Sequence, residues 1–120
     1  MLPKQYRLRK AADFARVRRF GRSSGHPLLS VYLLAKRPPD IRIGFTVSKK
    51  VGKAVTRNLV KRRLSEAIRP HLGDLRPGCD LVIIARPSAA GASYQDLAGA
   101  LEKQLVRSGA LRRREVVGNG

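Results

Sequence analysis

Apolar and polar residues alternate strictly through IRIGFTVS, residues 41–48, so this stretch predicts a β-strand. Its apolar positions are Ile41, Ile43, Phe45 and Val47. Because the side chains of a strand point alternately to the two faces of a sheet, we expect one face of this strand to be buried and the other to be open.

A second strand is predicted for residues 28–37, LLSVYLLAKR, which are rich in Leu, Val and Tyr. The turn Pro38-Pro39-Asp40 connects it to residues 41–48, which predicts an antiparallel hairpin. Residues 22–27, RSSGHP, are predicted to be a loop. The faces of the second strand carry Leu29, Val31 and Leu33 on one side, and Leu28, Ser30, Tyr32 and Leu34 on the other.

Three segments have helical patterns. The first begins at Ala11 and ends before Gly21, and the last begins after a Ser93 cap and ends at Gly109. The middle helix runs from about Val55 to Arg69, and Pro70 closes it. Its apolar stripe contains Val60, Leu64, Ala67 and Ile68, and the opposite face carries Asn58, Lys61, Arg62, Ser65 and Arg69.

The order of these elements predicts an α+β fold around a small sheet. Residues 79–86, CDLVIIAR, are almost continuously apolar, as in a central strand. A chain of 120 residues is one domain by length, so we expect a single domain over residues 1–120. From about residue 110 the chain has little to bury and carries Arg112, Arg113 and Arg114, which predicts a flexible cationic tail.

Charge narrows the class of partner. The sequence contains 26 Lys and Arg against 8 Asp and Glu, a formal net charge of +18. Such an excess favours nucleic acid or an anionic membrane surface as the partner, and an acidic protein less so. No apolar run approaches the roughly 18 residues that a membrane-spanning helix needs, so we expect no membrane association.

The cations concentrate in one segment. From Lys49 to Arg63 there is no acidic residue, and the apolar stripe of the middle helix can hold the charges in fixed positions. The alternative is an amphipathic helix whose charges are merely solvated. The predicted RNA-binding residues are Lys49, Lys50, Lys53, Arg57, Asn58, Lys61, Arg62 and Arg63.

Catalytic chemistry is not visible in the chain. The acids stand singly, neither His26 nor His71 has a nucleophilic partner, and no phosphate-binding loop of the P-loop type occurs. We therefore expect a binding protein without a catalytic residue or a side-chain metal site. Cys79 cannot form an internal disulfide and suits a reducing compartment, and the first ten residues lack the apolar segment of a secretion signal. Both features favour the cytoplasm.

Phe14 allows two interpretations. It lies in the first predicted helix, surrounded by Arg16, Arg18 and Arg19. Phe14 either packs into the core beside solvated arginines or stays partly exposed, as a surface for unpaired nucleotides requires.

The sequence resembles the protein subunit of bacterial ribonuclease P over most of its length. The most specific block combines Ser48-Lys49-Lys50-Val51-Gly52 with Ala54-Val55-Thr56-Arg57-Asn58 and Lys61-Arg62. Further matching segments are Tyr6-Arg7-Leu8, Asp13-Phe14, the strand that carries Tyr32, Gly44-Phe45-Thr46-Val47 and Asp80-Leu81-Val82-Ile83-Ile84-Ala85-Arg86-Pro87.

The resemblance implies a small α/β sandwich around a short mixed sheet, with a left-handed βαβ crossover. It implies a protein that joins a catalytic RNA and assists endonucleolytic removal of the 5′ leader from precursor tRNA, with one protein per RNA. The catalytic centre, and the Mg²⁺ that serves it, would then belong mainly to the RNA. The basic helix would face that RNA, and a cleft containing Phe14, Val17, Arg18 and Tyr32 would hold the leader.

Two positions depart from the family pattern. The usual Arg-Asn-Arg reads Arg57-Asn58-Leu59 here, and Arg63 could take over part of the missing contact. In the cleft, Arg18 replaces a position that is often aromatic, with Phe20 two residues later. Two other functions are considered: a structural RNA-binding protein or RNA chaperone, which the basic helix would serve equally well, and a protein-only nuclease, which the few acids argue against.

Overall fold

The computed structural model describes residues 2–111. Its helices are α1 (Ala11–Phe20), α2 (Ala54–Ile68) and α3 (Tyr94–Ser108), and its strands are β1 (Arg22–Gly25), β2 (Leu29–Ala35), β3 (Ile41–Thr46) and β4 (Cys79–Ala85). Short 3₁₀ helices connect them: η1 (Lys4–Tyr6), η2 (Arg69–Asp74) and η3 (Pro87–Gly91).

The four strands form one mixed sheet in the order β1-β2-β4-β3. β4 pairs antiparallel with β2 and parallel with β3, so the predicted hairpin between β2 and β3 is wrong. The loop between those strands instead passes around the start of β4. The Lys36 N–H donates to the Gly78 carbonyl at 2.8 Å, and the Gly78 N–H donates to the Pro39 carbonyl at 2.9 Å. The almost wholly buried β4 takes the central place that its apolar sequence predicts, and this separates its neighbours.

The first strand was not expected, because RSSGHP is polar. β1 is an edge strand that pairs antiparallel with β2. Its Ser24 is buried and hydrogen-bonds to Gln104 of α3, so the polar side chain finds a partner inside the fold. An edge strand of this kind is stabilised by pairing and packing with its neighbours rather than by apolar residues of its own.

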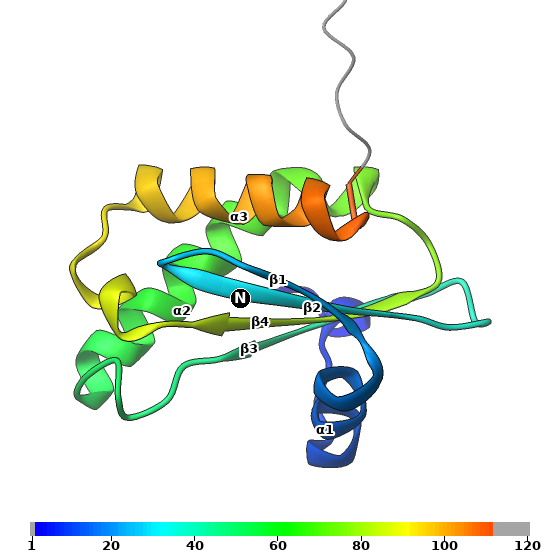
Figure 1. Ribbon diagram of the computed structural model, residues 1–120, viewed down its shortest axis with the longest axis horizontal. Coiled ribbons are helices and arrows are strands. Elements are labelled where there is room, and N and C mark those ends of the chain that lie inside the picture. The colour runs from blue at the N-terminus through cyan, green and yellow to red at the C-terminus, as the bar shows by residue number, and fades with distance from the viewer. Residues whose placement is uncertain (1, 112–120) are drawn as a thin grey trace, which may run out of the picture.

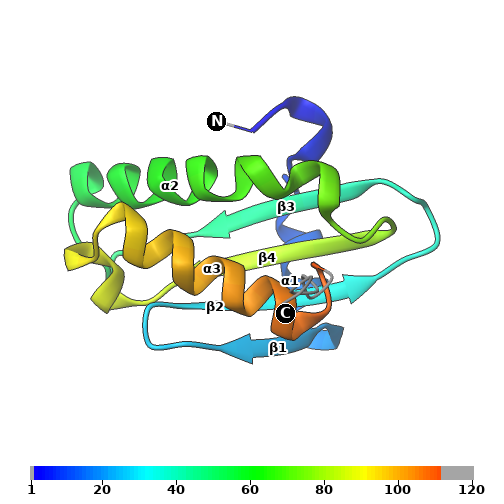
Figure 2. The ribbon, with the colours of Figure 1, turned by 90° about the horizontal axis from the view of Figure 1, so that it is seen from above.

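The crossover from β3 through α2 to β4 is left-handed. Viewed from the side of α2 with the strand direction pointing up, β4 lies to the left of β3 (Figure 2). Parallel strands joined in this way almost always have the opposite hand. The unusual hand confirms what the family resemblance implied.

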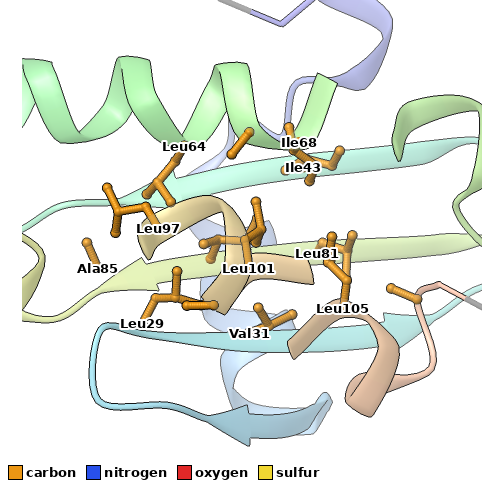
Figure 3. Packing of buried hydrophobic residues seen from close by; sticks show 14 of the residues in the cluster. Leu29, Val31, Ile43, Leu64, Ile68, Leu81, Ala85, Leu97, Leu101 and Leu105 are labelled. Atoms are coloured by element: carbon orange, nitrogen blue, oxygen red, sulfur yellow. The ribbon is translucent and has the colours of Figure 1, made fainter. Parts of the chain in front are cut away.

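The sheet separates two apolar layers of unequal size. α2 and α3 pack on one face and α1 on the other (Figure 1). The larger core, between the sheet and the helix pair, holds Leu64 and Ile68 of α2, Leu97, Leu101 and Leu105 of α3, and Leu29, Val31, Ile43 and Leu81 of the strands (Figure 3). The apolar stripe of α2 is therefore confirmed, whereas Ser65, expected on its open face, is buried. The predicted open face of β3 is wrong, because Gly44 on that face is buried beneath Phe14 of α1.

The ends of α3 follow their predicted signals. The Ser93 hydroxyl accepts a hydrogen bond from the Asp96 N–H at 3.0 Å, and Gly109 ends the helix with a φ of 88°, which favours glycine. Ala110 and Leu111, placed in the tail by the sequence analysis, are buried, and Leu111 forms a bridge with Leu75. The rest of the predicted tail lies outside the described residues.

Candidate nucleic-acid interface

The basic surface is formed by the loop before α2 and the outward face of that helix. Six of the eight predicted RNA-binding residues are exposed there: Lys49, Lys50, Lys53, Asn58, Lys61 and Arg62. The buried stripe on the other side of α2 fixes the helix against the sheet. The charges thus stand on a rigid element instead of a free tail.

The N-terminal end of α2 adds a second source of positive potential. The first turn contains no acidic residue, and the N-cap residue, Lys53, makes no side-chain hydrogen bond to the free N–H groups of that turn. A helix N-terminus attracts anions through these groups and through the helix dipole. Nearby Arg57 is half-buried, and its Nε has no hydrogen-bond partner within residues 2–111.

Arg63 differs from the other predicted contacts because it points towards the protein. It is half-buried, and one of its guanidinium nitrogens donates to the Ala92 carbonyl at 2.8 Å. This hydrogen bond ties α2 to the segment before α3. The geometry favours a packing role for Arg63. Its position therefore does not support the suggestion that Arg63 replaces the RNA contact that Leu59 cannot make.

The predicted cleft residues lie on the opposite face of the sheet. Phe14 and Tyr32 are half-buried around a small apolar cluster of Leu8, Val17 and Val82. Val17 is fully buried, so it supports the wall of this surface from inside, whereas Arg18 is exposed on α1.

Gly44 on β3 allows Phe14 to lie directly against the sheet. A Cβ atom at position 44 would overlap the Phe14 ring, so only glycine fits beneath it. The ring therefore packs on the backbone of β3. Phe14 is neither wholly buried nor fully exposed, which is the arrangement that the stacking interpretation needs.

A network of charges, which the sequence analysis did not find, connects α1 to this face. Asp80 on β4 is 3% exposed and accepts hydrogen bonds from Arg42 at 2.9 and 3.1 Å, while Lys36 lies 2.8 Å away. Arg42 also reaches Asp13 of α1 at 3.4 Å, and Asp13 pairs with Arg16. Arg42 and Asp80 are register partners on neighbouring parallel strands, but this signal becomes readable only once the strand order is known.

The environment of Asp80 keeps it ionised. Burial by itself would raise the pKa of this carboxyl, but the hydrogen bonds and charges of Arg42 and Lys36 outweigh that effect and hold the pKa below its usual value. The ionised Asp80 can thus balance two half-buried cations, Arg42 and Lys36. Through Arg42, which also contacts Asp13, it is connected to α1.

Cys79 should be chemically inert in the folded protein. Its side chain is buried, and burial, with a smaller contribution from the nearby Asp80, raises the pKa of the thiol to about 11. Because the thiolate is the reactive form, we expect 5,5′-dithiobis(2-nitrobenzoate) to label the native chain far more slowly than the chain in guanidinium chloride at the same pH. Equal rates in the two solutions would show that Cys79 is accessible.

Within residues 2–111 no group of three or more His, Cys, Asp or Glu side chains is placed to hold a metal ion. In the same part of the chain, no helix has the length and apolar character needed to cross a membrane.

Fold and charge together define a small, strongly basic α+β protein whose cations gather on one helix and the loop before it. Comparison with known proteins identifies the class more closely. The sequence matches the family described as ribonuclease P over residues 2–109, and the chain belongs to this family of bacterial ribonuclease P proteins.

Its relatives agree in sequence and in fold. The ribonuclease P protein component of a Nocardioides species is 45% identical over 113 residues, which cover 92% of this chain and 97% of the relative. That of Clostridioides difficile is 38% identical over 102 residues, covering 84% and 90%. The solved RNase P protein of Staphylococcus aureus superposes with a TM-score of 0.82 at 32% identity, covering 91% of this chain and all of that one.

Proposed function

We propose that this chain binds the RNA subunit of ribonuclease P through the loop before α2 and the exposed face of that helix. The observation that carries this proposal is a cationic surface that contains no acid from Lys49 to Arg63 and is fixed to the core by the buried apolar stripe of α2. Cations held in place neutralise phosphates and release counterions without first having to be ordered. Family membership makes the ribonuclease P RNA the expected polyanion.

Arg57 is a candidate for the central phosphate contact. Its Nε is shielded from solvent and lacks an acceptor in the described chain, and such a group is costly to leave unsatisfied. A phosphate oxygen near the start of α2 could accept from Arg57 and from the free N–H groups of the first turn at the same time. The exposed Lys61 and Arg62 would extend the contact along the helix.

The opposite face of the sheet is proposed to hold the 5′ leader of precursor tRNA. Phe14 and Tyr32 offer aromatic surface for unpaired bases, and Arg18 is exposed on the same helix as Phe14. The chain would thereby favour precursor over mature tRNA in the assembled enzyme. The RNA would carry out the cleavage, and its phosphates would hold most of the Mg²⁺. We further propose that one protein binds each RNA and that the complex works in the cytoplasm.

Reconstitution tests the proposal directly. The full chain is mixed with a bacterial ribonuclease P RNA, and precursor tRNA cleavage is measured at low Mg²⁺ with and without protein. We expect strong stimulation by the protein and none from the protein alone. A failure to stimulate would refute the proposed function, and cleavage by the isolated chain would favour a protein-only nuclease.

Replacing Phe14 should weaken recognition of the leader specifically. Phe14→Leu keeps an apolar side chain over Gly44 but removes the aromatic face, and one base stack is worth about 1–3 kcal/mol, or at least fivefold in affinity. We therefore expect the reconstituted variant to bind precursor tRNA at least about fivefold more weakly and mature tRNA equally well. The measurement is the affinity of the holoenzyme for substrates with leaders of increasing length.

Tyr94→Leu provides the matched control, because Tyr94 is an exposed aromatic residue on α3, on the other side of the sheet. It should leave both affinities unchanged. Equal losses for leaderless and leader-bearing RNA in Phe14→Leu would support the alternative of a structural RNA-binding protein.

A further inference from the structure

Phe20 is the most exposed aromatic side chain in residues 2–111, with 67% of its surface open to solvent. It is the last residue of α1, and neither of the two surfaces proposed above includes it. α2 and α3 pack on the other face of the sheet, so neither helix can cover this ring (Figure 1). Because water is a poor solvent for an apolar ring, a partner that covered it would bind favourably.

Phe20 and Phe14 lie on different flanks of α1. Phe14 shares its flank with Arg18, four residues later in the helix. Phe20 shares the other flank with Arg16, four residues earlier. The two rings are six residues apart, which separates them by about 120° around the helix axis. The fully buried Val17 lies between them, where α1 meets the sheet. Phe20 therefore cannot supply the aromatic ring that the cleft lacks at Arg18.

The backbone that carries Phe20 is fixed by the residue after it. The Gly21 N–H donates to the Val17 carbonyl at 2.8 Å and closes the last turn of α1. A Cβ atom at position 21 would overlap the carbonyl oxygens of Val17 and Leu33, so only glycine fits between the helix and β2. Phe20 thus stands on a rigid support, and its backbone needs no further ordering when a partner binds.

The ring lies in a cationic environment. The guanidinium carbon of Arg19 is 5.3 Å from the centroid of the Phe20 ring, a cation–π contact on one face of the ring. One turn earlier, the Arg16 side chain is 51% exposed. Asp13, the acid of α1, pairs with both Arg16 and Arg42, so its charge is compensated within the protein. The result is a flat aromatic surface beside exposed positive charge.

We propose that this patch, formed by Arg16, Arg19 and Phe20, binds one unpaired nucleotide of a single-stranded RNA segment separate from the segment at Phe14. The base would stack on the face of the Phe20 ring that Arg19 leaves open, and the phosphate would meet the arginines. An acidic peptide would match the arginines without covering the ring, whereas a nucleotide matches both. Because every base has a π-face, we expect little preference for one base over another.

The position of the patch gives the proposal its consequence. α2 lies on the other face of the sheet, and Phe14 lies on the other flank of α1 (Figure 1). The chain could therefore hold two unpaired RNA segments at once, one on each flank of α1. The inference rests on RNA as the ligand of this chain, which is the proposed function.

The two flanks can be observed separately by NMR, because the chain contains only three phenylalanines. The full-length chain, with ¹³C-labelled phenylalanine, is titrated with an adenylate trinucleotide at constant ionic strength. We expect saturable ring-current shifts of the Phe20 signals, and these shifts should persist unchanged in Phe14→Leu. Hexaglutamate, which carries negative charge but no bases, should leave the Phe20 ring signals close to their free positions.

Phe20→Leu should weaken binding at this patch at least about fivefold, because it removes the stacking of one base on an aromatic ring. The substitution is made in a chain that already carries Phe14→Leu, so that only the Phe20 patch is measured. Binding is followed from the backbone amides of residues 16–22. Tyr94→Leu in the same background is the matched control, because Tyr94 is an exposed aromatic residue on α3, and it should leave the affinity unchanged.

Arg19→Ala removes the guanidinium that lies over the ring, and we expect a smaller loss of affinity than in Phe20→Leu. Its matched control is Arg22→Ala, which changes the net charge equally. Arg22 is exposed and lies on the same side of β1 as Ser24, which hydrogen-bonds to Gln104 of α3 on the other face of the sheet. Arg22→Ala should therefore leave the affinity unchanged.

Four results would overturn the proposal. Loss of the Phe20 shifts in Phe14→Leu would mean that one strand covers both rings. Equal shifts with hexaglutamate, or equal losses in Arg19→Ala and Arg22→Ala, would show general attraction of anions. Phe20 signals that move with protein concentration in the absence of RNA would show contact between two copies of the chain.

Failure of this site and failure of the proposed function are distinguishable. Cleavage stimulation and the leader dependence of Phe14→Leu are measured on the assembled enzyme, whereas the Phe20 patch is measured on the free chain. If Phe20→Leu alters the overall NMR spectrum, the comparison of Arg19→Ala with Arg22→Ala still decides.

Discussion

Asp80→Asn should lower the free energy of unfolding by about 3 kcal/mol, because removing one member of a buried ion pair leaves the remaining charges uncompensated. The Asp80 side chain is 4% exposed, and the replaced carboxylate neutralises Arg42 and Lys36, whose side chains are 30% and 16% exposed. In the variant these cations lose their strongest partner. For a domain of this size the loss corresponds to a decrease in melting temperature of about 12 °C.

The comparison requires a control with the same change in charge. Asp74→Asn raises the net charge by one unit as well, but Asp74 is exposed at the end of η2. We expect its melting temperature and denaturant midpoint to stay close to those of the wild type. If both variants lose the same stability, general repulsion in a chain of +18 is responsible and not the network around Asp80.

The pH dependence provides a second check on Asp80. The pKa of Asp80 is lower in the folded than in the unfolded chain. Its contribution to the free energy of unfolding is therefore complete above the pKa of the unfolded chain, about 3.9, and is lost as the pH falls through the pKa of the folded chain. The difference in unfolding free energy between wild type and Asp80→Asn should therefore be constant near neutral pH and should narrow in acid below about pH 4. A difference that persists at pH 2 would assign the effect to packing.

The sequence predicts local faces far better than it predicts pairing. Alternation along β2 and the 3.6-residue repeat of α2 are local properties: the first places Leu29, Val31 and Leu33 on one side, which the structure buries, and the second identifies the buried stripe of α2. The predicted hairpin between β2 and β3 is wrong. A short connecting turn suggests that two strands pair with each other, but the most apolar strand takes the central position of the sheet and separates them. β4 is that strand, and it is distant in sequence from both β2 and β3.

Hydrogen bonds and ion pairs inside the fold cannot be predicted from strand alternation or helix periodicity. Ser24 and Ser65 are polar residues that the sequence places in a loop or on an open face, yet both are buried. Asp80 appears in the sequence as a single acid, and its two partners, Arg42 and Lys36, come from other parts of the fold. The left-handed crossover is equally invisible to periodicity, because the usual hand is the opposite, and only the family resemblance predicted it.

The candidate site was easier to predict where charge alone defines it. The outward residues of α2 are exposed because a helix with one apolar stripe has only one way to face the core, and the exposed Lys49, Lys50 and Lys53 lie in the polar loop just before it. Arg63 shows the limit of this reasoning. It lies beside the apolar stripe of α2, and its hydrogen bond to the Ala92 carbonyl, not the pattern of its own helix, turns it towards the protein.

Replacing Lys61 and Arg62 together with Ala should reduce affinity for the ribonuclease P RNA by roughly thirtyfold at 0.15 M salt. The estimate follows from counterion release, in which each phosphate contact is worth about sixfold at that salt concentration. Both residues are exposed on the fixed face of α2, so their loss should not disturb the core. The measurement is the dissociation constant of the protein–RNA complex at several salt concentrations.

The salt dependence separates direct contacts from the general field of a basic protein. If both side chains meet phosphates, the slope of log affinity against log salt should fall in magnitude by about two. Lys103→Ala with Arg107→Ala removes two exposed cations, four residues apart on α3, and changes the net charge equally. An equal loss of affinity and slope in that control would mean that α2 contributes only charge. A larger loss in the α2 variant would mean that this helix contacts the RNA, because the two variants differ only in where the same charge is removed.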